Sequence, residues 1–361
     1  MFHATDLRKL SAFGDEVGVL SLYTTLEPGT SAAEGRLHSR LTHLRQTLDG
    51  AELTALVNAR LDALEPEITA LLDPAAPGLG RALFAQIAGE EMHTTWVQLP
   101  VGDLATLNPG GPYIWPLALA TQATAPVGVV RVGRDGLRLF DCRYGSAHEL
   151  EPTVFNLETT DWARTGQPSF PSLSRSGIHP DRFDRRVTDH LATYLRKSAP
   201  IVAEQAFRQS WEAVVLVGDP RSTSLLASDM PLGHRVTQVD AILDPYLSPA
   251  EVLDWLTPTL ERVRAERDTE LAEQVVDLAG AGVNGVLGLG GTLPMLREGR
   301  VGHLLVDPAG PWRATDPEAA DGLGDHLIRL ALEHGADFTL LDPAGAAPLA
   351  ATGGIAAILR W

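Results

Sequence analysis

Residues 126–143 read PVGVVRVGRDGLRLFDCR, and this stretch decides the fold that we predict for the centre of the chain. Two apolar runs flank Asp135-Gly136, a dipeptide that favours the tight turn of a β-hairpin. A third extended run lies near residues 147–157, and the apolar spacing over residues 181–207 predicts a long helix. The strand EAVVLVG, a loop at DPRSTS, a short helix and the strand HRVTQV follow. This order predicts a mixed-sheet α/β domain over residues 124–260.

The residues before the hairpin predict a smaller α/β domain over residues 1–123. Residues 17–26, VGVLSLYTTL, alternate as a strand does and precede the turn dipeptide Pro28-Gly29. Leucines at three- and four-residue spacing between residues 37 and 64 predict two helices. Three further runs read as strands: ALFAQIA at 82–88, HTTWVQLP at 93–100 and YIWPLALAT at 113–121.

The residues after 260 alternate between helix and strand patterns, which predicts a third domain over residues 261–361 built as a parallel-sheet sandwich. A charged helix begins at Ser248, and the strands read VGHLLVD at 301–307, ADFTLLD at 336–342 and GGIAAILRW at 353–361. The spacing G-x-G-x-x-G occurs at residues 280–285, but a helix pattern precedes it where a dinucleotide site needs a strand. We therefore expect a Gly-rich connection between two helices there.

Composition narrows the classes of function. The chain has 361 residues and a formal net charge of -17, which argues against non-specific binding to free nucleic acid. Its single cysteine, Cys142, fits a reducing cytoplasm, and no stretch of about 18 apolar residues predicts a membrane span. The histidines lack a metal-ligand spacing such as H-E-x-x-H, and no G-x-S-x-G elbow occurs. We expect no cofactor, no metal ion, and neither a membrane nor DNA as a partner.

Basic residues gather in one part of this acidic chain. Between Asp161 and Arg186, five arginines against three aspartates leave a charge of +2, and Trp162, Phe170 and Phe183 lie among them. Arginines near the start of a helix oppose its dipole, which favours an external anion such as RNA phosphate. The alternative is a solvated loop with an arginine-rich first helical turn. By contrast, Arg262, Arg264 and Arg267 lie among carboxylates, as in a salt-bridged surface helix.

The order of these segments resembles that of the bacterial archaeo-eukaryotic release factor-like proteins. GVLSLYTTLEPG is similar to the first strand of that family, VGVVRVGRDGLRLFDCRYGSAHELE to the start of its central domain, and EAVVLVGDPRSTSLL to the strand and loop that follow. The last three strand and helix segments resemble the terminal domain that the family shares with Pelota. The resemblance implies three domains, with a central RNase H-like domain that lacks nuclease activity and a C-terminal ribosomal-protein-like α/β/α sandwich.

The resemblance also implies a site. Release factors of this type carry a Gly-Gly-Gln motif before a long helix that contains an Arg-Phe pair, and here Thr165-Gly166-Gln167 and Arg182-Phe183 take those places. Gly166 and Gln167 are therefore the candidate catalytic residues for hydrolysis of peptidyl-tRNA. Thr165 adds a Cβ where glycine's freedom is needed and Pro168 removes a backbone donor, so we favour a non-catalytic role. The candidate residues for binding RNA are Arg164, Thr165, Arg175, Arg182, Arg185 and Arg186.

The function that the resemblance implies is that of a cytoplasmic translation factor. We expect it to act at the ribosomal A site, in rescue as Pelota does or in hibernation as Balon-type factors do. Its expected partners are ribosomal RNA and tRNA within the ribosome, with a translational GTPase as a further candidate. Three alternatives stay open: a peptidyl-tRNA hydrolase that uses Gly166 and Gln167, a stress-linked protein-interaction module that no longer binds ribosomes, and an unrelated small-molecule enzyme.

Overall fold

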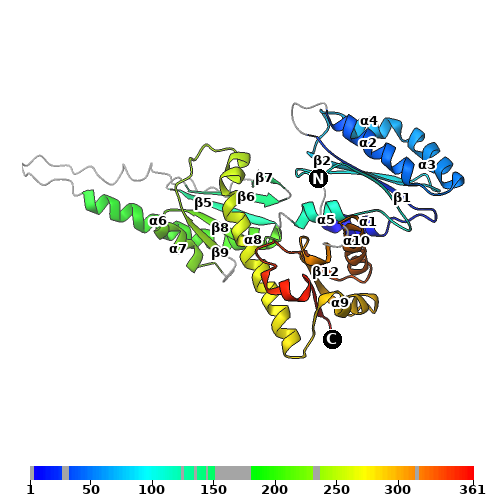
Figure 1. Ribbon diagram of the computed structural model, residues 1–361. Coiled ribbons are helices and arrows are strands. Elements are labelled where there is room, and N and C mark those ends of the chain that lie inside the picture. Colours follow the sequence, from blue (N-terminus) through cyan, green and yellow to red (C-terminus); the bar gives the residue numbers. More distant parts are fainter. Residues whose placement is uncertain are drawn as a thin grey trace, which may run out of the picture. The chain divides into compact units, whose positions relative to one another are not determined.

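The computed structural model describes residues 4–26, 32–122, 126–133, 136–143, 145–150, 180–230, 236–313 and 317–361 (Figure 1). The chain forms two compact units, and each is described by itself. One unit combines Met1–Thr124 with Arg264–Trp361, and the other is Ala125–Val263. The predicted boundary residues 123 and 260 lie close to the ends of the second unit. The division of the first unit into two separate domains stays a prediction.

The unit Ala125–Val263 is built on a five-stranded mixed sheet in the order β7-β6-β5-β8-β9. β5 pairs antiparallel with β6 and parallel with β8, so the predicted hairpin is confirmed, with Gly133 opposite Gly136 at its turn. β8 pairs parallel with β9. This strand order is the RNase H-like sheet that the resemblance implies. The strands are β5 (Val127–Gly133), β6 (Gly136–Arg143), β7 (Ser146–Glu149), β8 (Ala213–Gly218) and β9 (Val236–Asp240).

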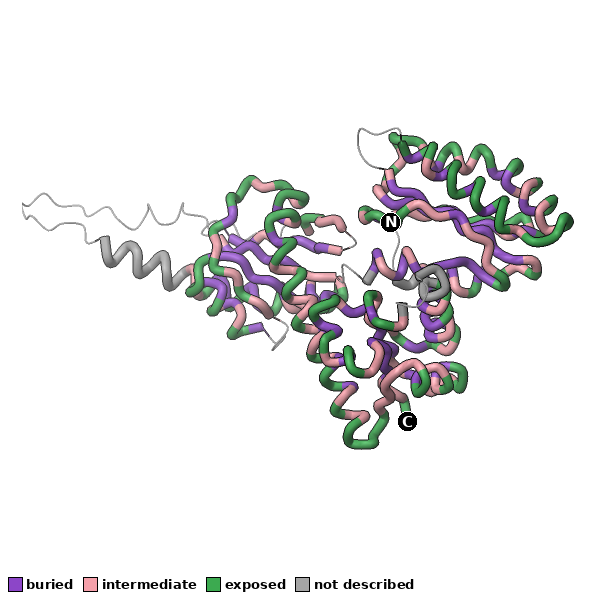
Figure 2. Tube along the Cα trace, viewed as in Figure 1, coloured by how far each residue is buried: buried purple, intermediate pink, exposed green. Residues whose placement is uncertain are grey.

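Helices cover both faces of this sheet because its strand residues alternate between two apolar clusters. Val130 and Leu216 pack with α6 (Pro180–Arg208) and α7 (Pro220–Ser228). Val129 and Phe140 face the start of α8 (Pro249–Gly280). Figure 2 shows the strands as buried and the outward sides of the helices as exposed. Cys142 lies in the second cluster, where burial raises the pKa of its thiol to about 12, so it stays protonated at neutral pH and is no nucleophile.

The first unit contains an antiparallel sheet near the start of the chain, in the order β3-β2-β1-β4. One face packs against the leucines of three helices, and the predicted helical spacing is confirmed (Figure 1). The strands are β1 (Val19–Thr25), β2 (Gly80–Gln86), β3 (Met92–Val97) and β4 (Leu104–Asn108), and the helices are α2 (Ala32–Thr47), α3 (Ala51–Ala63) and α4 (Glu65–Leu72).

The predicted strand at residues 113–121 is wrong, because this segment forms helix α5 (Trp115–Gln122). Its continuous run of apolar residues resembles a buried strand, but Pro116 occupies the first turn, where proline suits a helix. The start of the helix is also capped from a distance. The Asp325 carboxylate accepts hydrogen bonds from the backbone N–H groups of Ile114 at 2.6 Å and Trp115 at 3.1 Å. This contact joins residues that no local pattern relates.

A second sheet in the same unit has the order β10-β13-β11-β12. Only β11 and β12 run parallel, and β13 is antiparallel to both of its neighbours, so the predicted all-parallel sheet is wrong. The chain returns through Gly353 and Gly354, whose positive φ angles of 86° and 76° allow the sharp turn that aligns β13 against β11. The strands are β10 (Gly285–Leu287), β11 (Val301–Val306), β12 (Asp337–Leu340) and β13 (Ile355–Leu359).

This second sheet is the centre of an α/β/α sandwich. Leu305 and Ala356 pack against the latter part of α8 at Ala272, together with the 3₁₀ helix η4 (Ala347–Thr352). Leu304 faces the opposite cluster, which contains α9 (Gly288–Arg297) and α10 (Pro317–Glu333). A further 3₁₀ turn, η3 (Pro311–Arg313), precedes α10. Residues 280–285 connect α8 to β10, so the expected helix-to-helix connection is wrong.

One apolar cluster joins the two sheets of this unit. It contains Tyr23 and Phe84 from the first sheet, Leu304 from the second, and the helices α1 (Ala4–Ser11), α5 and α10 between them. The Tyr23 hydroxyl donates a 2.5 Å hydrogen bond to the carbonyl of Tyr113 inside this cluster. The shared core explains why Met1–Thr124 and Arg264–Trp361 form one compact unit.

Candidate nucleic-acid interface

The predicted site residues lie in and around the segment between β7 and α6. Five of them, Arg164, Thr165, Gly166, Gln167 and Arg175, fall at positions outside the described residues. The other three, Arg182, Arg185 and Arg186, lie in the first two turns of α6, where the helical backbone is described and the side chains are not.

Described residues before and after that segment contact the central sheet. Leu150 follows β7, donates its N–H to the carbonyl of Leu139 at 2.9 Å, and packs against the apolar cluster on the α6 side. Leu191 of α6 packs against the same cluster. In addition, the Tyr194 hydroxyl accepts a hydrogen bond from the N–H of Leu137 at 3.2 Å. The sheet therefore holds the strand that leads into the segment and the helix that follows it on one face.

Helix α6 has one buried side and one basic side. Its buried side chains recur at three- and four-residue spacing: Tyr194, Leu195, Ser198, Ala199, Val202 and Ala206. At about 100° per residue, positions 196 and 197 lie on the opposite side of the helix, and Arg196 and Lys197 are exposed there. Positions 182, 185 and 186 recur on that same side, within an arc of about 120°. Asp189 shares the arc and Arg196 has a loose 3.8 Å ion pair with Asp229.

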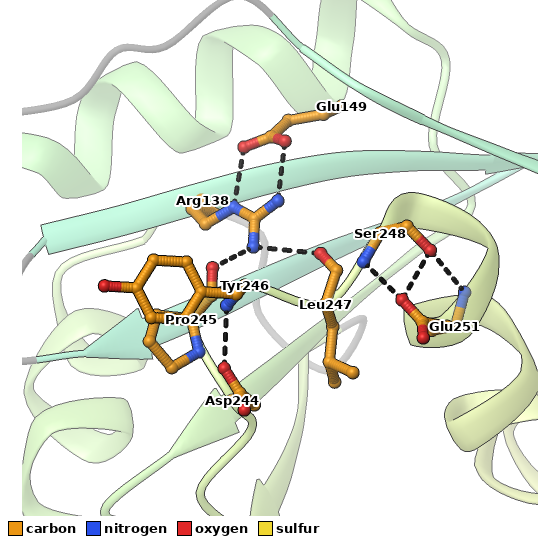
Figure 3. A network of polar contacts seen from close by, with 8 residues as sticks. All are labelled: Arg138, Glu149, Asp244, Pro245, Tyr246, Leu247, Ser248 and Glu251. Carbon is orange, nitrogen blue, oxygen red and sulfur yellow. Dashed lines mark hydrogen bonds and ion pairs between the residues drawn. The ribbon is translucent and has the colours of Figure 1, made fainter.

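An ion pair between Arg138 and Glu149 holds the C-terminal end of β7 (Figure 3). The guanidinium of Arg138 on β6 holds the Glu149 carboxylate through two hydrogen bonds of 2.7 Å. Its remaining nitrogen donates to the carbonyls of Pro245 at 2.5 Å and Leu247 at 3.1 Å, and the group lies 4.9 Å from the centre of the Phe140 ring. The hydrogen bonds from Arg138 to the carboxylate lower the pKa of Glu149. The bidentate geometry makes this pair directional.

The other face of β6 carries a matching pair. Arg143 and Asp141 form an ion pair with 2.7 Å contacts, and Asp141 accepts a 2.7 Å hydrogen bond from the indole N–H of Trp211. Arg143 also donates to the carbonyl of Gln209 at 2.7 Å, which ties the end of α6 to the sheet. Because side chains alternate along a strand, Arg138 reaches the loop before α8 and Arg143 reaches the end of α6.

Sequence reasoning missed these supporting residues and the two exposed cations of α6. The period of two residues along a strand could have assigned the residues of β6 to its two faces. One face carries Arg138, Phe140 and Cys142, and the other carries Leu139, Asp141 and Arg143. The helical period could likewise have extended the arginine positions to Arg196 and Lys197. Partners such as Glu149 and Trp211 could not be assigned, since pairing across the sheet needs the tertiary fold.

Two further observations concern the part of the chain that the structure describes. Among those residues no group of three or more His, Cys, Asp or Glu is placed to hold a metal ion. Within the same ranges, no helix is both long and apolar enough to cross a membrane.

The protein is a multi-domain α/β protein, and its central sheet with the flanking helices carries the candidate site on the basic side of α6. Residues 112–261 match the model of the Bacterial archaeo-eukaryotic release factor family 10. This match confirms the resemblance for the central part of the chain, where residues 112–261 are similar to that release factor-like family. No curated protein matches the chain in sequence.

The chain is also similar to solved structures that are distant in sequence. An archaeal translation termination factor, aRF1, is 16% identical, with 99% of this chain and 96% of that chain covered and a TM-score of 0.27. Archaeoglobus fulgidus Pelota is 14% identical, with 78% and 79% covered and a TM-score of 0.36. S. cerevisiae Dom34, described as a translation termination-like factor that interacts with Hbs1, is 9% identical, with 75% and 73% covered and a TM-score of 0.42.

Proposed function

We propose that this protein is a ribosome-associated translation factor that acts at the A site in the rescue or hibernation of stalled or idle ribosomes. The observation that carries the proposal is the basic side of α6, which lies opposite the buried side of the helix and includes exposed Arg196 and Lys197. Residues 161–186, which carry a net positive charge, include the first residues of this helix.

The charge distribution supports RNA as the ligand of this helix side. A chain with a net charge of -17 is repelled by bulk nucleic acid, so a local row of cations marks where phosphate can approach. Since α6 is tied to the sheet at Tyr194 and near its end at Gln209, that row stands on a fixed support. Ribosomal RNA or tRNA held in one shape by the ribosome suits such a surface better than free duplex RNA does.

The partners that we propose are the ribosome and a translational GTPase. The family match places the central unit among release factor-like proteins, and Dom34 is described as interacting with Hbs1. In this proposal the protein occupies the A site without cleaving peptidyl-tRNA, because Thr165 and Pro168 stand where the release chemistry needs a pliable backbone.

Replacing Arg182, Arg185 and Arg186 together by alanine tests the interface. We expect ribosome binding at physiological salt to weaken roughly tenfold or more, and the slope of log affinity against log salt to fall in magnitude by about 2–3. Co-sedimentation of the full chain with purified ribosomes over a salt series measures both quantities.

A matched control removes the same charge elsewhere. Arg40, Arg262 and Arg297 are exposed and form no ion pair among the described residues, so replacing these three by alanine should leave binding nearly unchanged. Equal losses in the two triple variants would show that net charge alone, and not the α6 side, controls binding.

The absence of hydrolysis is a separate expectation. Wild-type protein should release no peptide above background from stalled ribosomes, and Gln167→Ala should change neither this result nor ribosome binding. Gly166→Trp should impair docking through bulk alone. A peptide-release assay with purified stalled ribosomes measures this. Clear release by the wild type that Gln167→Ala reduces by about tenfold or more would contradict the proposal and favour the peptidyl-tRNA hydrolase.

A further inference from the structure

The loop that joins β9 to α8 exposes two large apolar side chains. Ile242 and Tyr246 are each 91% exposed, more than the other large apolar residues in the described part of the chain, of which Phe207 at 85% comes next. Burying such side chains is favourable, so their full exposure on one short loop calls for a reason. Single exposed apolar residues are common, but two on one ordered loop are not explained by chance placement alone.

The exposure does not come from a loose loop. Between the two exposed residues Leu243 is buried, and its carbonyl accepts a 3.1 Å hydrogen bond from the buried Arg131 guanidinium. Arg138 holds the carbonyls of Pro245 and Leu247 on either side of Tyr246, as Figure 3 shows. The N–H of Tyr246 itself donates to the Asp244 carboxylate at 2.8 Å.

The start of α8 fixes the far end of the loop. Ser248 and Glu251 form a reciprocal capping box, in which the Glu251 carboxylate accepts from the Ser248 N–H at 2.8 Å and from its hydroxyl at 2.6 Å (Figure 3). The backbone that carries Ile242 and Tyr246 is thus held at five points before any partner arrives. Such preorganisation lowers the entropy cost of binding.

The charge around these residues selects the partner. Residues 236–260 contain no Lys, Arg or His, while Asp240, Asp244, Glu251 and Asp254 are all exposed. Two guanidinium groups hold carbonyls of the loop, but Arg131 is buried and Arg138 is paired with Glu149. The four exposed carboxylates therefore repel nucleic acid phosphate and attract a positively charged surface. The aromatic ring of Tyr246 offers an apolar face and a hydroxyl, a combination that is frequent at protein interfaces.

We propose that the loop of residues 241–248 is a docking site for a positively charged protein segment that carries apolar side chains. Ile242 and Tyr246 contact the apolar side chains of that segment, and the four carboxylates face its lysines or arginines. This protein-binding surface lies on a different element from the basic side of α6, and the proposal does not rest on ribosome binding.

A peptide of defined composition tests the site without identifying the natural partner. The probe is a fluorescent 14-residue peptide of lysine and leucine, and its affinity for the full chain is measured by anisotropy at physiological salt. The double variant Ile242→Ser, Tyr246→Ser should bind it at least tenfold more weakly than the wild type. Since both side chains are exposed, the variant should keep the wild-type circular dichroism spectrum and melting temperature.

Phe207→Ser is the matched control, because it removes a comparably exposed apolar residue from α6 and should leave peptide affinity unchanged. Arg138→Gln releases the loop while keeping Ile242 and Tyr246, and should weaken binding if preorganisation matters. A peptide with serine in place of leucine, or glutamate in place of lysine, should bind far more weakly to the wild type.

Two results would overturn the proposal. One is equal affinity of the lysine–leucine peptide for the wild type and the double variant, which would assign its binding to net charge. The other is tighter binding of a single-stranded RNA oligonucleotide than of the peptide, lost in the double variant, which would make Tyr246 a base-stacking residue. Neither result bears on the Arg182, Arg185 and Arg186 test, so the two proposals fail independently.

Discussion

Replacing Asp268 by alanine should destabilise the unit Met1–Thr124 with Arg264–Trp361 by about 3–5 kcal/mol, the cost typical of breaking a buried ion pair. The Asp268 side chain is fully buried on α8, and its carboxylate contacts the Arg267 guanidinium at 2.6 Å. The other carboxylate oxygen accepts the backbone N–H of Asp342 at 2.7 Å and lies 3.7 Å from Arg264. Alanine leaves two arginines and a backbone donor without this partner.

The corresponding fall in melting temperature is roughly 10 °C for a unit of this size, measured by calorimetry or circular dichroism. Asp277→Ala is the control, since Asp277 is exposed on the same helix and its replacement should cost less than about 0.5 kcal/mol. Asp268→Asn, which keeps an oxygen for the Asp342 N–H, should fall between the two. A destabilisation of about 1 kcal/mol shifts the melting temperature by roughly 2 °C in a unit of this size. If the melting temperature of Asp268→Ala lies within about 2 °C of wild type, the Asp268 carboxylate does not stabilise the unit.

Asp325 should make the stability of the same unit fall as the pH rises from 5 to 8. Burial raises the pKa of this carboxyl to about 7, although hydrogen bonds from Ile114 and Trp115 and the charge of Arg329 act in the opposite direction. The folded pKa therefore exceeds the unfolded value of about 3.9. A group with a raised pKa contributes its full stability below the unfolded value and loses it as the pH rises through the folded value, here by about 2–3 kcal/mol between pH 5 and 8.

Comparison with Asp325→Asn isolates this contribution, because the amide keeps the shape and does not ionise. The stability of the variant relative to wild type, measured by urea unfolding, should rise by about 2–3 kcal/mol from pH 5 to pH 8. Burial lowers the pKa of His326, which makes a contribution of the opposite sign, so the difference between the proteins is the informative quantity. A constant difference across this range would place the Asp325 pKa near its ordinary value.

These two aspartates also bear on the architecture. Asp325 of α10 caps α5, which lies between the two sheets, and Asp268 of α8 binds the backbone just after β12. Each joins segments distant in sequence. The Asp325 contact also connects the chain's two ends and, with the shared apolar cluster, supports their union in one unit. The central unit has its own pairs, Arg138 with Glu149 and Arg143 with Asp141, and is stabilised separately.

The elements of the central unit were predictable because their signals are local. Asp135-Gly136 between two apolar runs indicates a hairpin, and the spacing of Leu191, Leu195 and Val202 indicates a helix whatever else surrounds it. The same periodicity relates Arg182, Arg185 and Arg186 to one helix side. The family resemblance likewise depends on the order of local segments, and its placement of Gly166 and Gln167 stays a prediction.

Contacts between distant residues decided what local patterns could not. The sequence YIWPLALAT is an apolar run like that of a buried strand, yet it is a helix because Asp325, about 210 residues later, caps its first turn. The direction of β13 depends on the turn at Gly353 and Gly354 and on its pairing with β11, so alternation of helix and strand patterns could not distinguish parallel from antiparallel. By itself the sequence determined the periodic elements and the local charge of this protein. Only the tertiary structure decided which faces are buried and which charges are paired. It alone placed Ile242 and Tyr246 in exposed positions on a fixed loop. The reason is that burial and pairing depend on surfaces that distant segments form together.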